Sequence, residues 1–459
     1  MTIGSAFPEE RRSRGKRKHV REENAPLISS SWEGDGEFDE LNGASFAGAV
    51  FNLSTTVIGA GIMSLPATMK VLGLVPGIAM IIFFAFLTEA SIELLIRFSR
   101  VGKSTSYGEV MGDSFGGTGK MLLQICVVIN NIGSMVVYMI IIGDVLSGTS
   151  SSGVHHYGVL EGWFGEHWWN ERFFVLLVTT LVIFAPLVSF KRVDSLRYTS
   201  ALSVALAVVF VVITAGIAVV KMLNGSIQMP NFFPVMSDLT SVWNLFTVVP
   251  ILVTAFVCHY NVHIIDNELE DSSQIKPIVR TSLALCSSVY IATSFFGYLL
   301  FGEFTLHDVL ANFDTDLGIP NSAALNDVVR VSYAAHLMLV FPIIFHAMRL
   351  NLDGLLFPSA RPLSSENCRF ILISAVLLSL IFLAANFIPS IWDAFQFTGA
   401  TAAVCIGYIF PAAMALKDPH GIATLRDKFH SVLMILLAVL SNGVALYSDA
   451  FSLFNNTRA

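Results

Sequence analysis

The chain has 459 residues, of which 54% are hydrophobic and only 13% are charged, and its formal net charge is −7. Soluble proteins carry about 25% charged residues, so this composition excludes a soluble protein and indicates an all-α, polytopic membrane protein. No basic stripe interleaved with aromatic residues is present, which excludes an ordinary nucleic-acid-binding protein.

Residues 1–43 form a polar tail without an apolar core, and we expect it to be disordered and cytosolic. No apolar stretch follows its basic residues closely enough for a secretory signal. The segment Glu23–Ile28 resembles an acidic dileucine signal, which a sorting adaptor would read as an address. A chance match in a polar tail is the alternative interpretation.

The first apolar segment, Ala49–Lys70, is poorly suited to one continuous helix. Gly59, Ala60 and Gly61 lie in its middle and Pro66 follows, while Asn52 and Thr56 add polar groups. Each glycine costs about 1 kcal/mol against alanine inside a helix. In a bilayer, opened backbone is tolerated only against protein or a watery cavity. We therefore predict a broken transmembrane helix that presents backbone groups to a ligand. A small-residue helix-packing face is the alternative.

Apolar runs of spanning length then follow one another to the end of the chain. About 20 apolar residues cross the hydrocarbon of a bilayer, and on this basis we predict eleven transmembrane helices. Their ranges are 44–68, 74–98, 119–147, 172–190, 199–223, 242–265, 277–301, 324–348, 369–388, 391–416 and 428–451. The short fourth span and the division between the ninth and tenth spans, at 388–390, have the weakest support.

Basic residues predict the orientation. With the N-terminus in the cytosol, only five of the 27 Lys and Arg residues fall on the opposite side, which agrees with the positive-inside rule. The glycosylation sequons at Asn224 and Asn455 then lie on the outer face. Both are close to a span, so we expect neither to be used.

Eleven spans divide into five, five and one. We expect residues 44–223 to form a first repeat, 242–416 a second repeat and 428–451 an added helix. Because each repeat has an odd number of spans, the second enters from the opposite face, as in the inverted repeats of many secondary transporters. This arrangement predicts that the sixth span is broken like the first.

The sixth span contains the signals of such a break. Pro250 removes a backbone donor, and several polar residues follow in its second half. They are Thr254, Cys258, His259, Tyr260, Asn261 and His263. Interrupted spans at matching positions of two repeats indicate a transport site. A proline kink tolerated by neighbouring helices is the alternative.

Ionisable residues at membrane depth are candidates for function. His259, His336 and Asp393 are, in that order, the candidates for proton coupling. A structural role is the alternative for each histidine, and the pair His259 and His263 lacks further metal ligands. Glu89 and Glu93, with Arg97 one turn further, are expected to be a solvated set at the membrane edge.

Nothing in the sequence predicts an enzyme, a metal site or a cofactor. The chain lacks HExxH, paired carboxylates and a nucleophile elbow. Its cysteines form neither a CxxC motif nor a disulfide framework; they are Cys126, Cys258, Cys286, Cys368 and Cys405. Two functions fit what remains: a secondary active transporter, or a membrane sensor that signals through its cytosolic tail.

Three motifs resemble the amino acid/auxin permease family. They are FNLSTTVIGAGIMSLP at Phe51–Pro66, FVCHYNVHIIDNELED at Phe256–Asp271 and, more weakly, FPIIFHAMR at Phe341–Arg349. Within that family the chain is most similar to the vacuolar amino acid transporters of plants, and to the related sodium-coupled neutral amino acid transporters. The resemblance covers residues 44–451 and excludes the tail.

The resemblance implies a LeuT-like fold of five plus five inverted spans and an eleventh, with alternating access to a central amino acid site. It implies that the first break holds the substrate carboxylate and the sixth span holds the ammonium. The corresponding N–H groups belong to Gly59, Ala60, Gly61 and Ile62, and the carbonyls to Thr254, Ala255, Phe256 and Val257. Asn52 and Thr56 of the first span complete the candidates for substrate binding.

Two departures from the sodium-coupled relatives bear on location and driving ion. Outer loops 148–171 and 224–241 lack the cysteines that form a disulfide in animal members, which favours a vacuolar membrane over the plasma membrane. Asn52 matches a sodium ligand of those relatives, but Val340 replaces their threonine hydroxyl. We therefore expect transport that is proton-coupled or driven by the substrate gradient alone.

Overall fold

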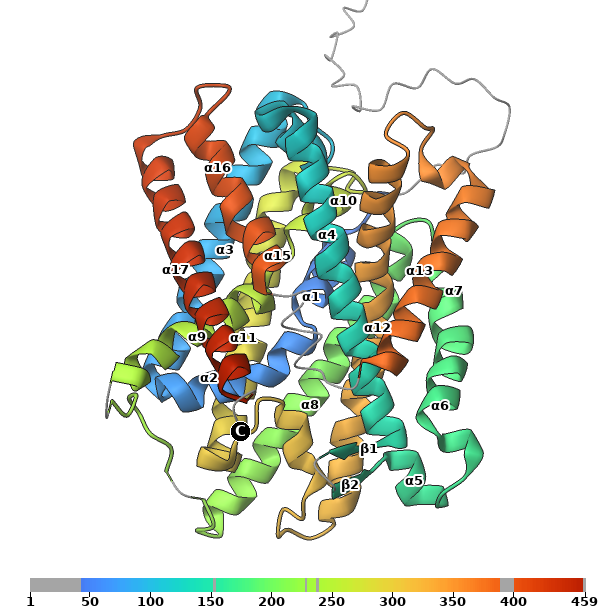
Figure 1. Ribbon diagram of the computed structural model, residues 1–459, viewed down its shortest axis with the longest axis vertical. Coiled ribbons are helices and arrows are strands. Elements are labelled where there is room, and N and C mark those ends of the chain that lie inside the picture. The colour runs from blue at the N-terminus through green and yellow to red at the C-terminus, as the bar shows by residue number, and fades with distance from the viewer. Residues whose placement is uncertain (1–42, 152–153, 228, 237–238, 389–399, 457–459) are drawn as a thin grey trace, which may run out of the picture. The chain divides into compact units, whose positions relative to one another are not determined.

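The computed structural model describes residues 43–151, 154–227, 229–236, 239–388 and 400–456 (Figure 1). The α-helices are α1 Phe46–Val57, α2 Leu65–Leu72, α3 Leu74–Gly102, α4 Tyr107–Ser147, α5 Val159–Phe164, α6 Arg172–Thr179, α7 Ala185–Val188, α8 Arg197–Leu223, α9 Leu239–Phe256, α10 His259–Asp266, α11 Ile275–Phe301, α12 Ser322–Leu356, α13 Asn367–Phe387, α15 Ala400–Val404, α16 Phe410–Lys417 and α17 Leu425–Asn456.

Short 3-10 and π segments join or flank these helices. The 3-10 segments are η1 Ala60–Ser64, η2 Trp168–Asn170, η4 Asp194–Leu196, η5 Ser272–Gln274, η6 Gly302–Phe304, η7 Val309–Asp314 and η8 Leu363–Ser365; the π segments are η3 Thr180–Phe184 and η9 Cys405–Ile409. One antiparallel hairpin, β1 Gly148–Ser151 with β2 Val154–Tyr157, pairs Gly148 with Tyr157. This hairpin was not predicted from the sequence.

The described part of the chain is a helical, polytopic membrane protein. Seven of its helices are long and apolar enough to cross a bilayer, and the bent pair of α1 with η1 and α2 makes an eighth. The segments Arg172–Val188 and Thr401–Lys417, at the predicted fourth and tenth positions, are apolar but shorter. The number of eleven spans therefore stays a prediction, and the division at 388–390 lies largely outside the described residues.

The first span is broken where the sequence predicts. Its two parts, Phe46–Val57 and Ala60–Leu72, are bent by 51°. Ile58 and Gly59 leave the helical conformation between them, with ψ values of 100° and −154°. Pro66 lies in the first turn of α2, where its missing N–H costs no helical hydrogen bond. The glycines therefore mark the break, and the proline starts the second half.

The sixth span is also interrupted, but not at the proline. Helix α9 continues through Pro250 to Phe256, and α10 begins at His259. Cys258 between them has φ −137° and ψ 4°. The two parts count as one span in length and composition, Leu245–Asp266. The expectation that Pro250 breaks the span is wrong, because its ring is accommodated within a helix.

The break of the first span lies inside the bundle. Helix α1 packs against α8, α11 and α12, and η1 packs against α4, α9 and α11. Helices α4 and α12 run side by side through the centre of the view in Figure 1 and make the most extensive helix contact of the described chain. The predicted site is therefore enclosed by helices from both halves of the sequence.

Candidate functional site

The two interruptions lie against each other. A Cβ atom placed on Gly61 would stand 3.3 Å from the Cα atom of Ala255 and 3.4 Å from its Cβ atom. Gly61 and Thr254 are partly exposed, although Ala60, Ile62 and Ala255 beside them are buried. The structure therefore brings the two predicted groups of backbone atoms together and leaves part of each accessible.

The break supplies backbone N–H groups at the start of a helix. The first N–H groups of any helix lack partners inside it, and the positive end of the helix dipole favours an anion there. The Ile62 N–H donates to the Gly59 carbonyl at 3.3 Å, and the Ala60 backbone lies beside the Tyr138 hydroxyl. The N–H groups of Gly59 and Gly61 are the ones that such an anion would find nearest the bend.

Three tyrosines, which the sequence analysis missed, converge on the breaks from three different helices. The hydroxyl of Tyr138 in α4 lies beside Gly59 and Ala60. Tyr333 of α12 donates to the Gly59 carbonyl at 2.9 Å, and Tyr290 of α11 contacts carbonyls of both interrupted spans. Each lies in the interior of an apolar span, where a phenol hydroxyl needs a hydrogen-bond partner. That requirement is the signal that could have found them.

Asn52 and Thr56, in α1 before the break, belong to a chain of hydrogen bonds. The Asn52 amide donates to the Val193 carbonyl at 3.1 Å, and its Oδ1 atom has no partner. The Thr56 hydroxyl donates to the Asn52 carbonyl at 3.0 Å and accepts from the amide of Asn261 in α10 at 2.9 Å. These bonds connect α1 directly to α10, so the two interrupted spans are also joined on this side.

His259 lies at the first position of α10 and is buried. Its Nε2 atom is 3.1 Å from the Ser91 hydroxyl in α3, which donates in turn to the Gly407 carbonyl in η9 at 2.5 Å. Its Nδ1 atom has no hydrogen-bond partner. His263, one turn later, stacks on Tyr107, and neither of its ring nitrogens has a partner. Both histidines face neighbouring helices.

His336 lies at the break itself. Its Nδ1 atom is 2.8 Å from the Ser203 carbonyl, so Nδ1 must carry the proton of this hydrogen bond. The ring stacks on Tyr333 at 5.4 Å and also lies against the backbone of Ile58, while its Nε2 atom has no hydrogen-bond partner of good geometry. A second proton on this ring would therefore appear next to the unwound backbone. Asp393, the third candidate, lies outside the described residues.

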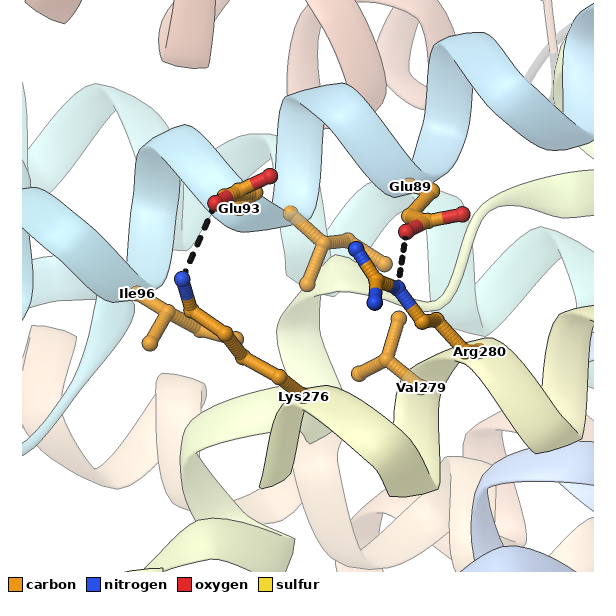
Figure 2. A pocket seen from close by; sticks show the side chains of 7 residues that line it. Glu89, Glu93, Ile96, Lys276, Val279 and Arg280 are labelled. Carbon is orange, nitrogen blue, oxygen red and sulfur yellow. Dashed lines mark hydrogen bonds and ion pairs between the residues drawn. The ribbon is translucent and has the colours of Figure 1, made fainter. Parts of the chain in front are cut away.

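The acidic residues of α3 pair across helices. Glu89 pairs with Arg280 at 2.5 Å and Glu93 with Lys276 at 2.9 Å. Figure 2 shows these two ion pairs, which join α3 to α11 beside a small pocket. Arg97 pairs instead with Asp427 at 2.6 Å. These side chains are partly exposed, as expected, but the expectation that they pair within α3 is wrong, because α11 presents two cations at the matching four-residue spacing. These four charges therefore neutralise one another across the two helices.

A carboxylate joins three segments at the end of the bundle that we predict to be cytosolic. Glu268, after α10, accepts the N–H groups of Val193 and Asp194 at 2.9 and 2.5 Å. Its backbone carbonyl also accepts the N–H of Ala44 at 2.8 Å. Burial raises the pKa of this carboxyl, against the lowering effect of the two N–H groups. The start of the first span, the end of the sixth and the loop before α8 are thus tied together.

No three His, Cys, Asp or Glu side chains lie close enough to hold a metal ion among the described residues. The described cysteines are free thiols. The site therefore consists of backbone dipoles, hydroxyl groups and imidazoles, and such groups can bind and release a small zwitterion without changing a covalent bond.

Comparison with known proteins places the chain among transporters. Residues 42–454 match the family model of transmembrane amino acid transporter proteins. The amino acid transporter AVT6A of Arabidopsis thaliana is 67% identical over 94% of both chains. AVT6B of the same plant is 64% identical over 95% of this chain and 96% of its own.

The solved structures that resemble the chain are distant in sequence. A Na⁺-coupled sialic acid symporter in an outward-open state gives a TM-score of 0.54 at 15% identity, covering 86% of this chain and 88% of its own. A manganese transporter of Eremococcus coleocola gives 0.52 at 13% identity, covering 93% and 90%. At this level of identity the comparison shows a shared fold only.

Proposed function

This chain belongs to the transmembrane amino acid transporter family, and from that premise we propose that it carries amino acids across a membrane by alternating access. The observation that supports this most directly is the contact between two interrupted spans, with Gly61 against Ala255. Backbone groups freed at such interruptions are the usual ligands of transported solutes and ions. The shared fold with two transporters points the same way.

We assign the substrate carboxylate to the first break and the ammonium to the sixth span. The N–H groups of Gly59 and Gly61, at a helix start, suit an anion. The carbonyls between Thr254 and Val257, at the end of α9, carry the partial negative charge that suits a cation. A zwitterion between them would have both its charges met by helix ends. The chemistry is binding and conformational exchange, with no covalent step.

The domain arrangement that goes with this function is the LeuT-like one. Residues 44–223 form the first repeat, 242–416 the inverted second repeat, and 428–451 the added helix. The interruptions at Ile58 and Cys258 support it, because each falls in the span that opens its repeat. The hydrogen bonds of Glu268 would then have to break if these segments separate to release substrate on that side.

For the coupling ion we propose the proton, with His336 ahead of His259. His336 faces the break and is stacked on Tyr333, whose hydroxyl donates to the Gly59 carbonyl. His259 is bonded to Ser91 of α3, away from the bend. Histidine titrates in the physiological range, so protonating His336 would add a positive charge beside the backbone that is assigned to the carboxylate.

We place the protein in the vacuolar membrane with its N-terminus in the cytosol. The resemblance of the sequence motifs to plant vacuolar transporters, the cysteine-free outer loops and the Glu23–Ile28 signal support this. The signal lies outside the described residues. Changing Leu27 and Ile28 to Ala should move the protein toward the cell surface. An unchanged distribution would show that another signal directs it.

The decisive experiment for the function itself is reconstitution. Purified full-length protein in liposomes should take up one or more labelled amino acids, and an imposed pH gradient should change the initial rate. A protein that binds an amino acid but moves none would instead support the sensor alternative. Deleting residues 1–43 separates these outcomes further, because transport should survive the loss of the tail and signalling should not.

A further inference from the structure

Helix α11 donates hydrogen bonds to α1 along one face. Ser282 donates to the Val50 carbonyl at 3.1 Å, Cys286 to the Ser54 carbonyl at 3.7 Å, and Tyr290 to the Val57 carbonyl at 2.6 Å. The three donors are four residues apart, so they share a face of α11. The last of them reaches the final residue of α1, where the first span breaks.

Tyr290 alone among these donors also reaches the other interrupted span. Its hydroxyl oxygen is 2.7 Å from the Ala255 carbonyl in the last turn of α9. The side chain has no exposed surface, and its ring packs edge-on against Phe256 at 5.2 Å. One buried hydroxyl therefore lies between the C-terminal ends of two half-helices.

The hydroxyl has fewer protons than these contacts need. A phenol carries one O–H donor, and a backbone carbonyl can only accept. Both oxygen–oxygen distances are those of hydrogen bonds. The carbonyls at the end of a helix lack partners inside it and carry partial negative charge. The proton of Tyr290 can therefore make a full-strength hydrogen bond to only one of Val57 and Ala255 at a time.

We propose that Tyr290 is a positioning residue whose single hydroxyl proton ties the C-terminal ends of α1 and α9 together, one carbonyl at a time. The Tyr290 hydroxyl sets the distance between the two breaks. Because its proton bonds to one carbonyl at a time, one half-helix can move away while the other stays hydrogen-bonded. Its effect on transport rests on the function proposed above, whereas its effect on the breaks does not.

Other tyrosines of the described chain provide the contrast. Tyr333 donates to the Gly59 carbonyl of the first break at 2.9 Å, and no hydrogen bond found in the described part of the chain joins it to the second. Tyr298, two turns after Tyr290 on the same helix, accepts the N–H of Asn231 at 3.3 Å, and among the described residues it has no hydrogen bond to either break. Tyr298→Phe is therefore the matched control for loss of a buried hydroxyl from α11.

The first test measures amide hydrogen exchange in purified full-length protein, without any amino acid. Tyr290→Phe should speed exchange at both 58–62 and 254–258 by about fivefold, the change expected for one lost hydrogen bond. Tyr298→Phe should leave both segments unchanged. Unchanged exchange in Tyr290→Phe, or a change in only one segment, would overturn the proposal. Since no substrate is used, this result stands even if the protein transports nothing.

The second test changes the number of donors. 4-Aminophenylalanine at position 290 offers two N–H groups for the two carbonyls and keeps the shape of the ring. It should slow exchange at both segments below the wild-type rate and lower kcat for uptake, because both half-helices are then held. Tyr290→Phe should raise KM instead. If the amino variant behaves like Tyr290→Phe in the exchange measurement, hydrogen bonding from position 290 does not hold the two breaks together, and the proposal is wrong.

Discussion

Gly61 lies so close to Ala255 that even an added Cβ atom would be tight, at 3.3 Å from the Ala255 Cα atom. A glycine can be needed at such a break for close backbone approach or for a positive φ angle. The structure supports the first reason and not the second, because Gly61 lies against Ala255 and is absent from the described residues with positive φ. The glycine is required by the closeness of two half-helices.

Replacing Gly61 with Val should abolish transport and leave expression and membrane insertion intact. Overpacking a tight contact costs about 1–3 kcal/mol, and here that cost falls on the distance between the two breaks. Uptake into proteoliposomes measures the effect. Gly61→Ala should give an intermediate rate, because a single methyl group can be absorbed by a shift of a few tenths of an ångström.

The control for this prediction is Gly216→Val in α8. Gly216 is exposed, and nothing lies within 4 Å of its missing side chain. This variant should transport at the wild-type rate. Near-normal uptake by Gly61→Val would show that the two spans do not need to approach each other as closely as the structure shows.

The second prediction concerns Gly59 and its close contact with Tyr138. A Cβ atom on Gly59 would stand 2.3 Å from the Tyr138 hydroxyl oxygen and 3.2 Å from the ring carbon that bears it. Gly59→Ala should therefore reduce uptake more than Gly61→Ala does. Removing the hydroxyl relieves the worse contact, so Gly59→Ala with Tyr138→Phe should transport faster than Gly59→Ala alone. No gain in the double variant would mean that the clash is not the cause.

Much of this arrangement could be predicted from the sequence, since apolar length and glycine position are local properties. The run Gly59-Ala60-Gly61 located the first break within one residue of Ile58. The neighbours of a helix are not local properties. Nothing in the spacing of Glu89 and Glu93 identifies α11 as their partner, and nothing around Tyr290 indicates two carbonyls from separate spans. The effect of Pro250 also depends on the surroundings of its helix, because membrane helices accommodate proline when other helices surround them. The sequence alone therefore could not show that α9 continues through Pro250.

The proton-coupling assignment makes a third prediction. His336→Asn removes the titrating ring but keeps an N–H donor near the position of Nδ1, which bonds to Ser203. Its uptake should lose the response to an imposed pH gradient, whereas His259→Asn should keep it. The measurement is the initial rate with and without the gradient at a fixed substrate concentration. A response that survives in His336→Asn and disappears in His259→Asn would reverse the assignment.

The fourth prediction concerns Asp308 and the pH dependence of the protein's stability. It lies in the loop between α11 and α12, where its carboxylate accepts the Leu310 N–H at 2.9 Å. Burial raises its pKa from 3.8 to about 6, and nearby Asp144 acts in the same direction, against the lowering effect of Leu310. The folded state then binds this proton more tightly than the unfolded state. The stability that it contributes is complete below about pH 4 and is lost as the pH rises through 6.

Asp308→Asn should therefore gain thermal stability relative to the wild type as the pH rises from 4 to 7. The amide keeps an acceptor for Leu310 and never takes up a charge. Thermal unfolding of both proteins in the same detergent over this range measures the difference. A difference that does not change with pH would show that Asp308 is already ionised without cost.

The last prediction concerns the driving ion. Asn52, which matches a sodium ligand of the related transporters, is buried and already donates its amide to the Val193 carbonyl, while its Oδ1 atom has no partner. Val340, which stands where those relatives have a threonine, has no exposed surface and no oxygen to offer. A Na⁺ ion leaving water must have its hydration replaced, because an uncompensated buried charge is very costly. Replacing Na⁺ with choline at fixed pH should therefore leave the initial rate of uptake unchanged.

Val340→Thr restores the missing hydroxyl in nearly the same shape, and this variant should become faster in Na⁺ than in choline. A large fall of the wild-type rate in choline would show that a working sodium site does not need an oxygen at Val340.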